Sequence, residues 1–237
     1  MRIGLVVPVL NNFDQAIDLV YSAKSKNDLK IYIQPQYRYQ VPLAAAWNRG
    51  IQEAIADGCE VIIVSNDDVI FSPYSIDKLA FETSIMEDKF VMAHPVDLLD
   101  VVDDPADILF FDEDTYMAAK NVEDQTYSCF AIRSDFFDKC GMFDENFDPA
   151  WWEDTDMKYR IHLLGYKTLQ TDVPFVHLRH QSTKKLTMPL NSIKSGEYYI
   201  KKWGSAKKDL REAFANPYND VRLSPKDWRK QWARLEY

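Results

Sequence analysis

Continuous apolar runs of strand length recur along the chain and are separated by segments with helical spacing. The first run covers residues 3–10 (IGLVVPVL), and a run of this kind is typical of a strand buried on both faces of a parallel sheet. The remaining runs predict strands at residues 30–33, 61–64, 90–96, 127–132 and 169–176, and a short strand near residues 108–111.

Between the strands, apolar side chains recur with the period of a helix. Pro42 opens one such segment and Gly58 closes it, as expected of a proline at the first turn and a glycine just past the last. Ser72 and Pro73 supply an N-cap and a first-turn proline for another helix. The predicted helices lie at residues 16–21, 42–57, after Ser72-Pro73, at 134–140 and at 153–164, with an amphipathic helical tail from Lys184 onward.

The alternation of strands and helices predicts a doubly wound α/β fold. Its sheet is expected to be mixed and mostly parallel, with helices on both faces, and ligands in such sheets bind beyond the carboxyl ends of the strands. The chain has 237 residues, of which 46% are hydrophobic, and this is enough for one sizeable core.

Charge divides the chain into two parts. The net charge is -17 over residues 1–178 and +8 over residues 179–237, and the total is -9. The acidic total argues against nucleic-acid binding, because phosphate neutralisation requires clustered Lys and Arg. The basic part either attracts a phosphate-bearing or lipid-linked acceptor or packs its Trp and Tyr residues on the acidic domain, and both interpretations stay open.

Two features of the sequence bear on cellular location. Residues 3–10 form the longest apolar run, which is far shorter than the roughly 20 residues that cross a bilayer, and the amino terminus lacks a recognisable secretory signal. The cysteines Cys59, Cys129 and Cys140 are widely spaced and odd in number, which favours buried core residues over disulfides. We therefore expect a cytoplasmic protein with no transmembrane segment.

The glycine-rich loops that often bind nucleotides are missing. None of the seven glycines forms GxGxxG or GxxxxGK[ST], so a nucleotide diphosphate would need a metal ion. Asn66, Asp67 and Asp68 follow the predicted strand 61–64, and a divalent cation would stabilise two carboxylates held side by side there. The same residue types also make ordinary turns, so this cluster alone leaves both interpretations open.

A second acidic cluster opens the predicted helix 153–164. Glu153, Asp154 and Asp156 follow two adjacent tryptophans, Trp151 and Trp152. Acids at this position interact favourably with the helix dipole, which by itself accounts for them. An indole beside carboxylates also suits a sugar, whose apolar face packs on the ring while its hydroxyls meet acceptors.

Seven motifs in chain order resemble those of glycosyltransferase family 2, whose members adopt the GT-A fold. The motifs are VVPVLN (6–11), AWNRGI (46–51), NDD (66–68, with Asn at the first position of the family's DxD motif), GMFDE (141–145), WEDTD (152–156), RIHLLGYK (160–167) and His177 with Ser182-Thr183. The resemblance covers residues 1–183. It implies a GT-A catalytic domain with a donor half over about residues 1–97 and an acceptor half over about 98–183, followed by a basic helical extension over 184–237.

The resemblance also implies roles on the donor side. Asp68 and His177 would bind Mn²⁺ or Mg²⁺, while Asn66 and Asp67 would touch the ribose or the surroundings of the metal. The donor would be a nucleotide sugar carrying UDP, dTDP or GDP. The residues expected to contact it are Pro8, Asn11, Asn48, Asn66 and Asp67.

On the acceptor side, the resemblance implies an inverting mechanism. Asp154 would take the proton from the acceptor hydroxyl, and Glu153 would hold the acceptor or the base. Trp151 and Trp152 would contact an acceptor that is a glycan or another hydroxyl compound, lipid-linked ones included. The expected activity is that of a hexosyl- or related transferase.

Departures from the family pattern leave alternatives. The D-[GN]-S-x-D signature after the second strand is replaced by Gln34-Pro35-Gln36-Tyr37, so the base of the nucleotide stays open, and His180 competes with His177 for the metal. A sugar nucleotidyltransferase would need a basic, glycine-rich loop after the first strand, and an aspartyl-phosphate phosphatase would need an Asp pair there; both are missing. A non-catalytic carbohydrate- or nucleotide-sugar-binding module remains the alternative to an enzyme.

Overall fold

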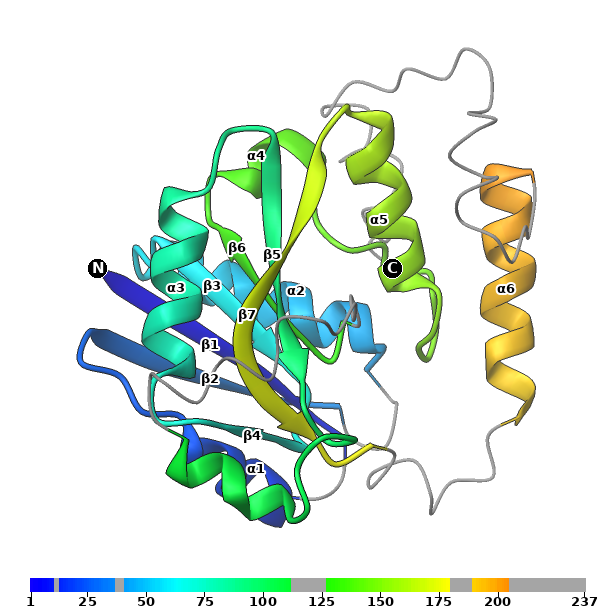
Figure 1. The fold of residues 1–237 in the computed structure, drawn as a ribbon. Helices are drawn as coiled ribbons and strands as arrows, with labels where there is room; N and C mark the ends of the chain where they lie inside the picture. Colours follow the sequence, from blue (N-terminus) through cyan, green and yellow to red (C-terminus); the bar gives the residue numbers. More distant parts are fainter. Residues whose placement is uncertain (11–12, 37–40, 112–126, 180–188, 205–237) are drawn as a thin grey trace.

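A computed structural model describes residues 1–10, 13–36, 41–111, 127–179 and 189–204, and it contains one seven-stranded sheet in the order β2-β1-β3-β6-β5-β7-β4 (Figure 1). Strands β1, β2, β3, β5 and β7 run in one direction, and β6 and β4 run against them. The strands are β1 (Arg2–Val9), β2 (Asp28–Pro35), β3 (Val61–Ser65), β4 (Val69–Phe71), β5 (Phe90–Asp97), β6 (Cys129–Arg133) and β7 (Lys167–His177). The expected mixed, mostly parallel sheet is therefore confirmed.

Helices cover both faces of this sheet. The helices are α1 (Phe13–Ser22), α2 (Leu43–Ala56), α3 (Ser75–Ile85), α4 (Phe136–Cys140), α5 (Glu153–Leu163) and α6 (Pro189–Trp203), together with the 3-10 helix η1 (Pro105–Phe110). Helices α1 and α3 share one buried apolar cluster with the sheet, whereas α2, α4 and α5 share another on the opposite face. The continuous apolar runs of β1 and β3 are explained by this arrangement, because both of their faces are buried.

Two local predictions were wrong. Residues 108–111 were expected to form a strand, but they lie in and just after η1, whose start is fixed by Pro105 and by a capping box that Asp104 forms. The helix predicted to be capped by Ser72 begins only at Ser75, and the hydroxyl of Ser72 is 2.7 Å from that of Ser75. The preceding residues form β4, a three-residue edge strand that the sequence pattern did not reveal.

Helix α6 belongs to the predicted basic extension and lies on the far side of α5 from the sheet (Figure 1). Its side chains Tyr199 and Trp203 are buried against α5 and the loop that precedes it, together with Phe147 and Tyr159. Among the described residues, no helix is long and apolar enough to span a bilayer.

Candidate active site

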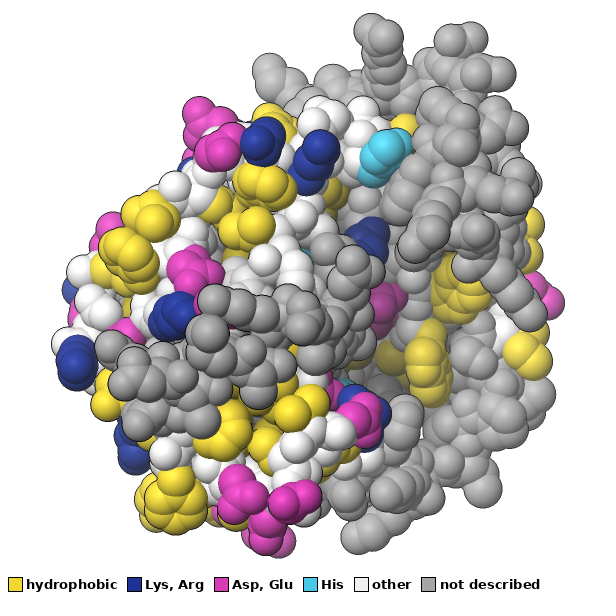
Figure 2. Space-filling view, in the orientation of Figure 1, with side chains coloured by type: hydrophobic (Ala, Val, Ile, Leu, Met, Phe, Trp, Pro, Cys, Tyr) yellow, Lys and Arg dark blue, Asp and Glu magenta, His cyan; other side chains and the backbone are white. Residues whose placement is uncertain are grey.

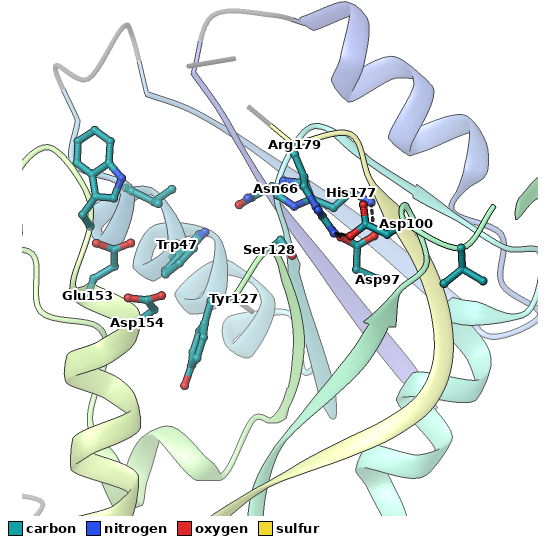
Figure 3. Close-up of a pocket in the computed structure, with 13 residues that line it drawn as sticks. Trp47, Asn66, Asp97, Asp100, Tyr127, Ser128, Glu153, Asp154, His177 and Arg179 are labelled. Carbon is teal, nitrogen blue, oxygen red and sulfur yellow. Dashed lines mark hydrogen bonds and ion pairs between the residues drawn. The ribbon is translucent and has the colours of Figure 1, made fainter. Parts of the chain in front are cut away.

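A cleft of about 690 Å³ opens at the edge of the sheet where β3, β5 and β7 end (Figure 3). Its lining residues are Leu43, Trp47, Asn66, Asp97, Asp100, Val101, Tyr127, Ser128, Trp151, Glu153, Asp154, His177 and Arg179. In Figure 2, acidic side chains (magenta) are visible in and below the hollow near the middle of this face. The cleft thus lies where ligands of doubly wound sheets bind.

The wall of the cleft at the strand ends, here called the strand-end wall, contains one predicted metal residue, His177, and the other, Asp68, is buried against it. The Nε2 atom of His177 lies 3.1 Å from Oδ1 of Asp68, and the Asp68 side chain is only 6% exposed. Register explains this contact, because β4 pairs antiparallel with β7 and sets Val69 opposite His177. Asp67 and Asp68 are both buried in this turn and neither lines the cleft, whereas Asn66 and His177 do.

Asp97 and Arg179 complete the strand-end wall, and sequence reasoning missed both. Asp97 ends β5 and is buried, and its Oδ1 accepts hydrogen bonds from the backbone N–H groups of Leu99 and His177. Its Oδ2 accepts from Arg179, which also contacts Asp100 at 2.8 Å and has a positive φ of 43°. The missed signal was an acid at the carboxyl end of a predicted strand.

The opposite wall carries the acid pair at the start of α5. In Figure 3 the carboxylates of Glu153 and Asp154 point from this helix toward Trp47, and the strand-end residues lie across the cleft. Oδ1 of Asp154 accepts a hydrogen bond from the backbone N–H of Thr155 at 2.6 Å. The two predicted clusters, distant in sequence, therefore line one cavity through Asp154 and His177.

The side chain of Glu153 is buried with one carboxylate oxygen left without a hydrogen-bond partner among the described residues. It is 4% exposed, and its Oε2 has no hydrogen-bond partner among the residues that the structure describes. Burial raises the pKa of Glu153 well above its ordinary value, and the nearby Asp154 and Asp156 raise it further. Carboxyl groups whose pKa is strongly shifted by burial and that lie at a cleft are concentrated at functional sites.

The two tryptophans before α5 lie in different surroundings. Both have positive φ angles, 70° for Trp151 and 75° for Trp152, so the chain turns sharply and the indoles diverge. Trp151 lines the cleft. Trp152 does not line it, and instead packs on Tyr199 of α6 with ring centroids 5.0 Å apart.

Three further predicted donor contacts lie away from the described cleft or outside the described residues. Pro8 is buried within β1 opposite Gln34. The amide of Asn48 is engaged internally, since it binds both the C=O and the N–H of Phe143 at 2.8 and 3.0 Å. Asn11 and the alternative metal ligand His180 fall outside the described residues.

The donor atoms on the strand-end wall fit part of a metal shell. Two ligand atoms that each lie about 2.1 Å from a metal ion, at right angles to each other, are about 3 Å apart. The 3.1 Å between Oδ1 of Asp68 and Nε2 of His177 agrees with this spacing. Within the described part of the chain, no group of three or more His, Cys, Asp or Glu side chains could hold an ion. An ion here would need further ligands, and phosphate oxygens are suitable ones.

The fold is that of known glycosyltransferases. The chain is similar to Drosophila β1,4-galactosyltransferase 7 in a complex with manganese, UDP-Gal and xylobiose, with a TM-score of 0.55 and 15% identity over 81% of this chain and 78% of that one. A second structure of its catalytic domain, with xylobiose, matches with the same values. GalNAc-T7 with UDP, GalNAc and Mn²⁺ matches with a TM-score of 0.59 and 16% identity over 98% of this chain, which spans 54% of that protein.

These matches establish the class of fold, which is the GT-A type. No family model matches the chain, and no curated protein matches it by sequence. The likeness therefore belongs to the arrangement of the backbone, and the roles of the site residues stay predictions.

Proposed function

We propose that this protein is a metal-dependent glycosyltransferase that moves a sugar from a nucleotide-sugar donor to an acceptor hydroxyl, with inversion at the anomeric carbon. One observation carries the proposal: on a GT-A-type fold, a single cleft has His177, which contacts the buried Asp68, on one wall and the Glu153–Asp154 pair on the other. The neighbours with manganese and UDP support the choice of donor and metal. The order of the sequence motifs supports assignment to family 2.

On the donor side, Asp68 and His177 would hold Mn²⁺ or Mg²⁺ at the end of β3 and β7. Such an ion stabilises the negative charge that develops on the leaving diphosphate. Asn66 lines the cleft beside this pair, where its amide can bind the nucleotide. UDP is the first nucleotide to test, because both neighbouring enzymes contain it.

On the acceptor side, Asp154 would accept the proton of the attacking hydroxyl. It lies in the cleft on the wall opposite the metal pair, so an acceptor between the walls can attack the anomeric carbon from the side away from the diphosphate. Glu153 would hold that acceptor, because a buried, protonated carboxyl group can donate a hydrogen bond to a sugar hydroxyl. Trp151 would pack on the apolar face of the sugar ring.

The experiment that tests the proposal is a nucleotide-release assay. UDP-, GDP- and dTDP-sugars are each incubated with the protein and a panel of methyl glycosides, with Mn²⁺ or with a chelator. We expect metal-dependent release that rises with one acceptor, and the anomeric configuration of the product, measured by NMR, tests inversion. Binding of donors, seen as thermal shifts, without release across the whole panel would indicate a non-catalytic module instead.

A further inference from the structure

Helix α6 reaches α5 through aromatic side chains. The rings of Tyr159 on α5 and Trp203 on α6 meet edge to face with centroids 4.8 Å apart. Phe147, in the loop before α5, meets Tyr198 in the same manner at 4.9 Å. These contacts give α6 a fixed position on the outer side of α5.

A buried cluster of four charged groups lies at the end of this contact. Lys202 of α6 places its Nζ 2.7 Å from Oδ2 of Asp144 and 2.6 Å from Oδ1 of Asp156, and the side chains of both acids are 0% exposed. Arg160, also 0% exposed, donates to the other oxygen of Asp156 at 2.9 Å. Two cations thus balance two anions, which is the condition under which charges remain buried.

The balance depends on Lys202. Burial alone would raise the pKa of Asp156, but Lys202 and Arg160 hold it below its ordinary value. Burial also lowers the pKa of Lys202 against the opposing effect of the two acids, so the ammonium is retained by these contacts. Trp203 adds a hydrogen bond from its Nε1 to Asp156 at 2.8 Å.

Helix α6 contacts the chain on both sides of the acid pair Glu153–Asp154. Asp156 lies two residues after Asp154 in the first turn of α5. Before the pair, Ser195 of α6 donates a hydrogen bond to the carbonyl oxygen of Ala150, which directly precedes Trp151. Helix α6 therefore holds the chain just before and just after Glu153 and Asp154.

We propose that Lys202 is a positioning residue, through which α6 holds the first turn of α5 so that Glu153 and Asp154 face the cleft. The inference rests on the proposed transferase function for its catalytic consequence, but the positioning itself is measurable without a substrate. It assigns the basic extension a part in building the site and favours the packing interpretation over attraction of an acceptor.

Removing Lys202 has an electrostatic effect as well as a mechanical one. In Lys202→Met, Arg160 alone would face Asp144 and Asp156, and the uncompensated negative charge would lie beside the acid pair. Among the described residues, the hydroxyl of Tyr127 also interacts with Asp154, and Glu153 and Asp154 interact with each other. Added negative charge favours the protonated form of a nearby carboxylic acid, so we expect the acidic limb of the pH–kcat profile to move to higher pH.

The first test is hydrogen–deuterium exchange on the full chain, with Lys202→Met compared with Lys201→Met. Lys201 is the exposed neighbour on α6 and serves as a matched control. We expect exchange at residues 150–157 to become about tenfold faster in Lys202→Met, with β1 and β3 unchanged and the control equal to wild type. Equal exchange at residues 150–157 in the two variants would overturn the proposal.

A second variant keeps the test decisive if Lys202→Met folds poorly. Lys202→Met combined with Asp144→Asn restores the charge balance of the cluster. We expect the double variant to regain slow exchange at residues 150–157. Faster exchange in the double variant than in Lys202→Met would overturn the proposal.

The second test uses turnover with the donor identified by nucleotide release. We expect Lys202→Met to lower kcat about 10- to 100-fold, because small misplacements of a base have this effect, while the affinity for UDP with Mn²⁺ stays unchanged. The acidic limb of its pH–kcat profile should move up by about one unit and return in the double variant, a response that a purely structural loss would not give. If the acidic limb of the pH–kcat profile is the same in Lys202→Met and wild type, the proposal is contradicted. If wild type releases no nucleotide from any donor, the transferase function is contradicted, and the result of the exchange experiment still holds.

Discussion

The two walls of the cleft are built by different means. On the strand-end wall, His177 contacts the buried Asp68, and Asp97 has partners in Arg179 and backbone N–H groups. The pairing of the strands fixes the position of His177. On the α5 wall, Glu153 has no hydrogen-bond partner for Oε2 among the described residues. That wall depends on a helix end and on contacts with α6.

The difference teaches which part of the site is fixed and which is conditional. The strand-end wall is expected to bind the nucleotide and metal ion whenever the sheet is folded. The α5 wall is expected to respond to changes in α6 that leave the sheet intact, since its supporting contacts come from Lys202 and Ser195. Binding and turnover should therefore be separable by substitution.

The largest effect on turnover without an effect on donor binding is expected at Asp154. Asp154→Asn should lower kcat by about 100- to 10,000-fold, the contribution of a positioned base, while binding of UDP with Mn²⁺ remains. Single-turnover kinetics and calorimetry measure the two quantities. Loss of UDP binding with kcat unchanged would exclude this role for Asp154.

At Asp68 we expect the opposite, an effect on donor binding. Asp68→Asn should weaken Mn²⁺-dependent binding of UDP by about 100-fold, because it would remove the charge of the proposed metal ligand beside His177. Calorimetry with and without Mn²⁺ measures this change. Asp28→Asn, an exposed residue paired with Arg2 on the sheet, is the control and should leave binding unchanged.

The two adjacent tryptophans sharpen the comparison within one wall. Trp151→Ala should raise KM for the acceptor about fivefold, because an aromatic contact of about 1 kcal/mol is lost in the cleft. Trp152→Ala should instead lower the melting temperature by about 6 °C, since it removes packing on Tyr199. Acceptor kinetics and thermal melts of both variants distinguish the roles, and equal effects of the two on KM would contradict them.

The smallest effect concerns stability and pH. The folded-state pKa of Glu153 is raised, so its favourable contribution is fully present below its ordinary value of 4.5 and is lost as the pH rises through the folded-state pKa. Glu153→Gln should therefore raise the melting temperature by about 3 °C at pH 8 and leave it unchanged at pH 4. Glu87→Gln, at an exposed residue, should change neither value. A melting temperature of Glu153→Gln below wild type at pH 8 would contradict the burial argument.

The sequence was sufficient to predict the sheet, and four of the residues that it singled out, Asn66, Glu153, Asp154 and His177, line one cleft. Long apolar runs marked the buried strands, and acids at their carboxyl ends fall at one edge because the strands are mostly parallel. The sequence was insufficient for short segments whose structure depends on a neighbouring strand or on a local cap. Strand β4 has three residues and exists through its pairing with β7, and η1 depends on a local cap at Asp104.

Side-chain partners across long sequence separations were the other gap. The charge of the basic extension was visible, but burial of Lys202 between Asp144 and Asp156 requires the position of α6 relative to α5. Asn48 likewise looked like a ligand contact in its motif, whereas it ties α2 to the backbone of Phe143. A motif fixes residue types, and only the packed fold decides which of them face a ligand.

The pairing of β4 with β7 also bears on the order of folding. Asp68 comes from the chain between β3 and the edge strand β4, yet it meets His177 at the end of β7, the last strand of the sheet in sequence, which lies between β5 and β4. Contacts between segments so distant along the chain form late, because the intervening loop must be closed first. The imidazole–carboxylate contact should therefore appear among the final events of refolding, and an ion captured there would favour only the fully assembled sheet.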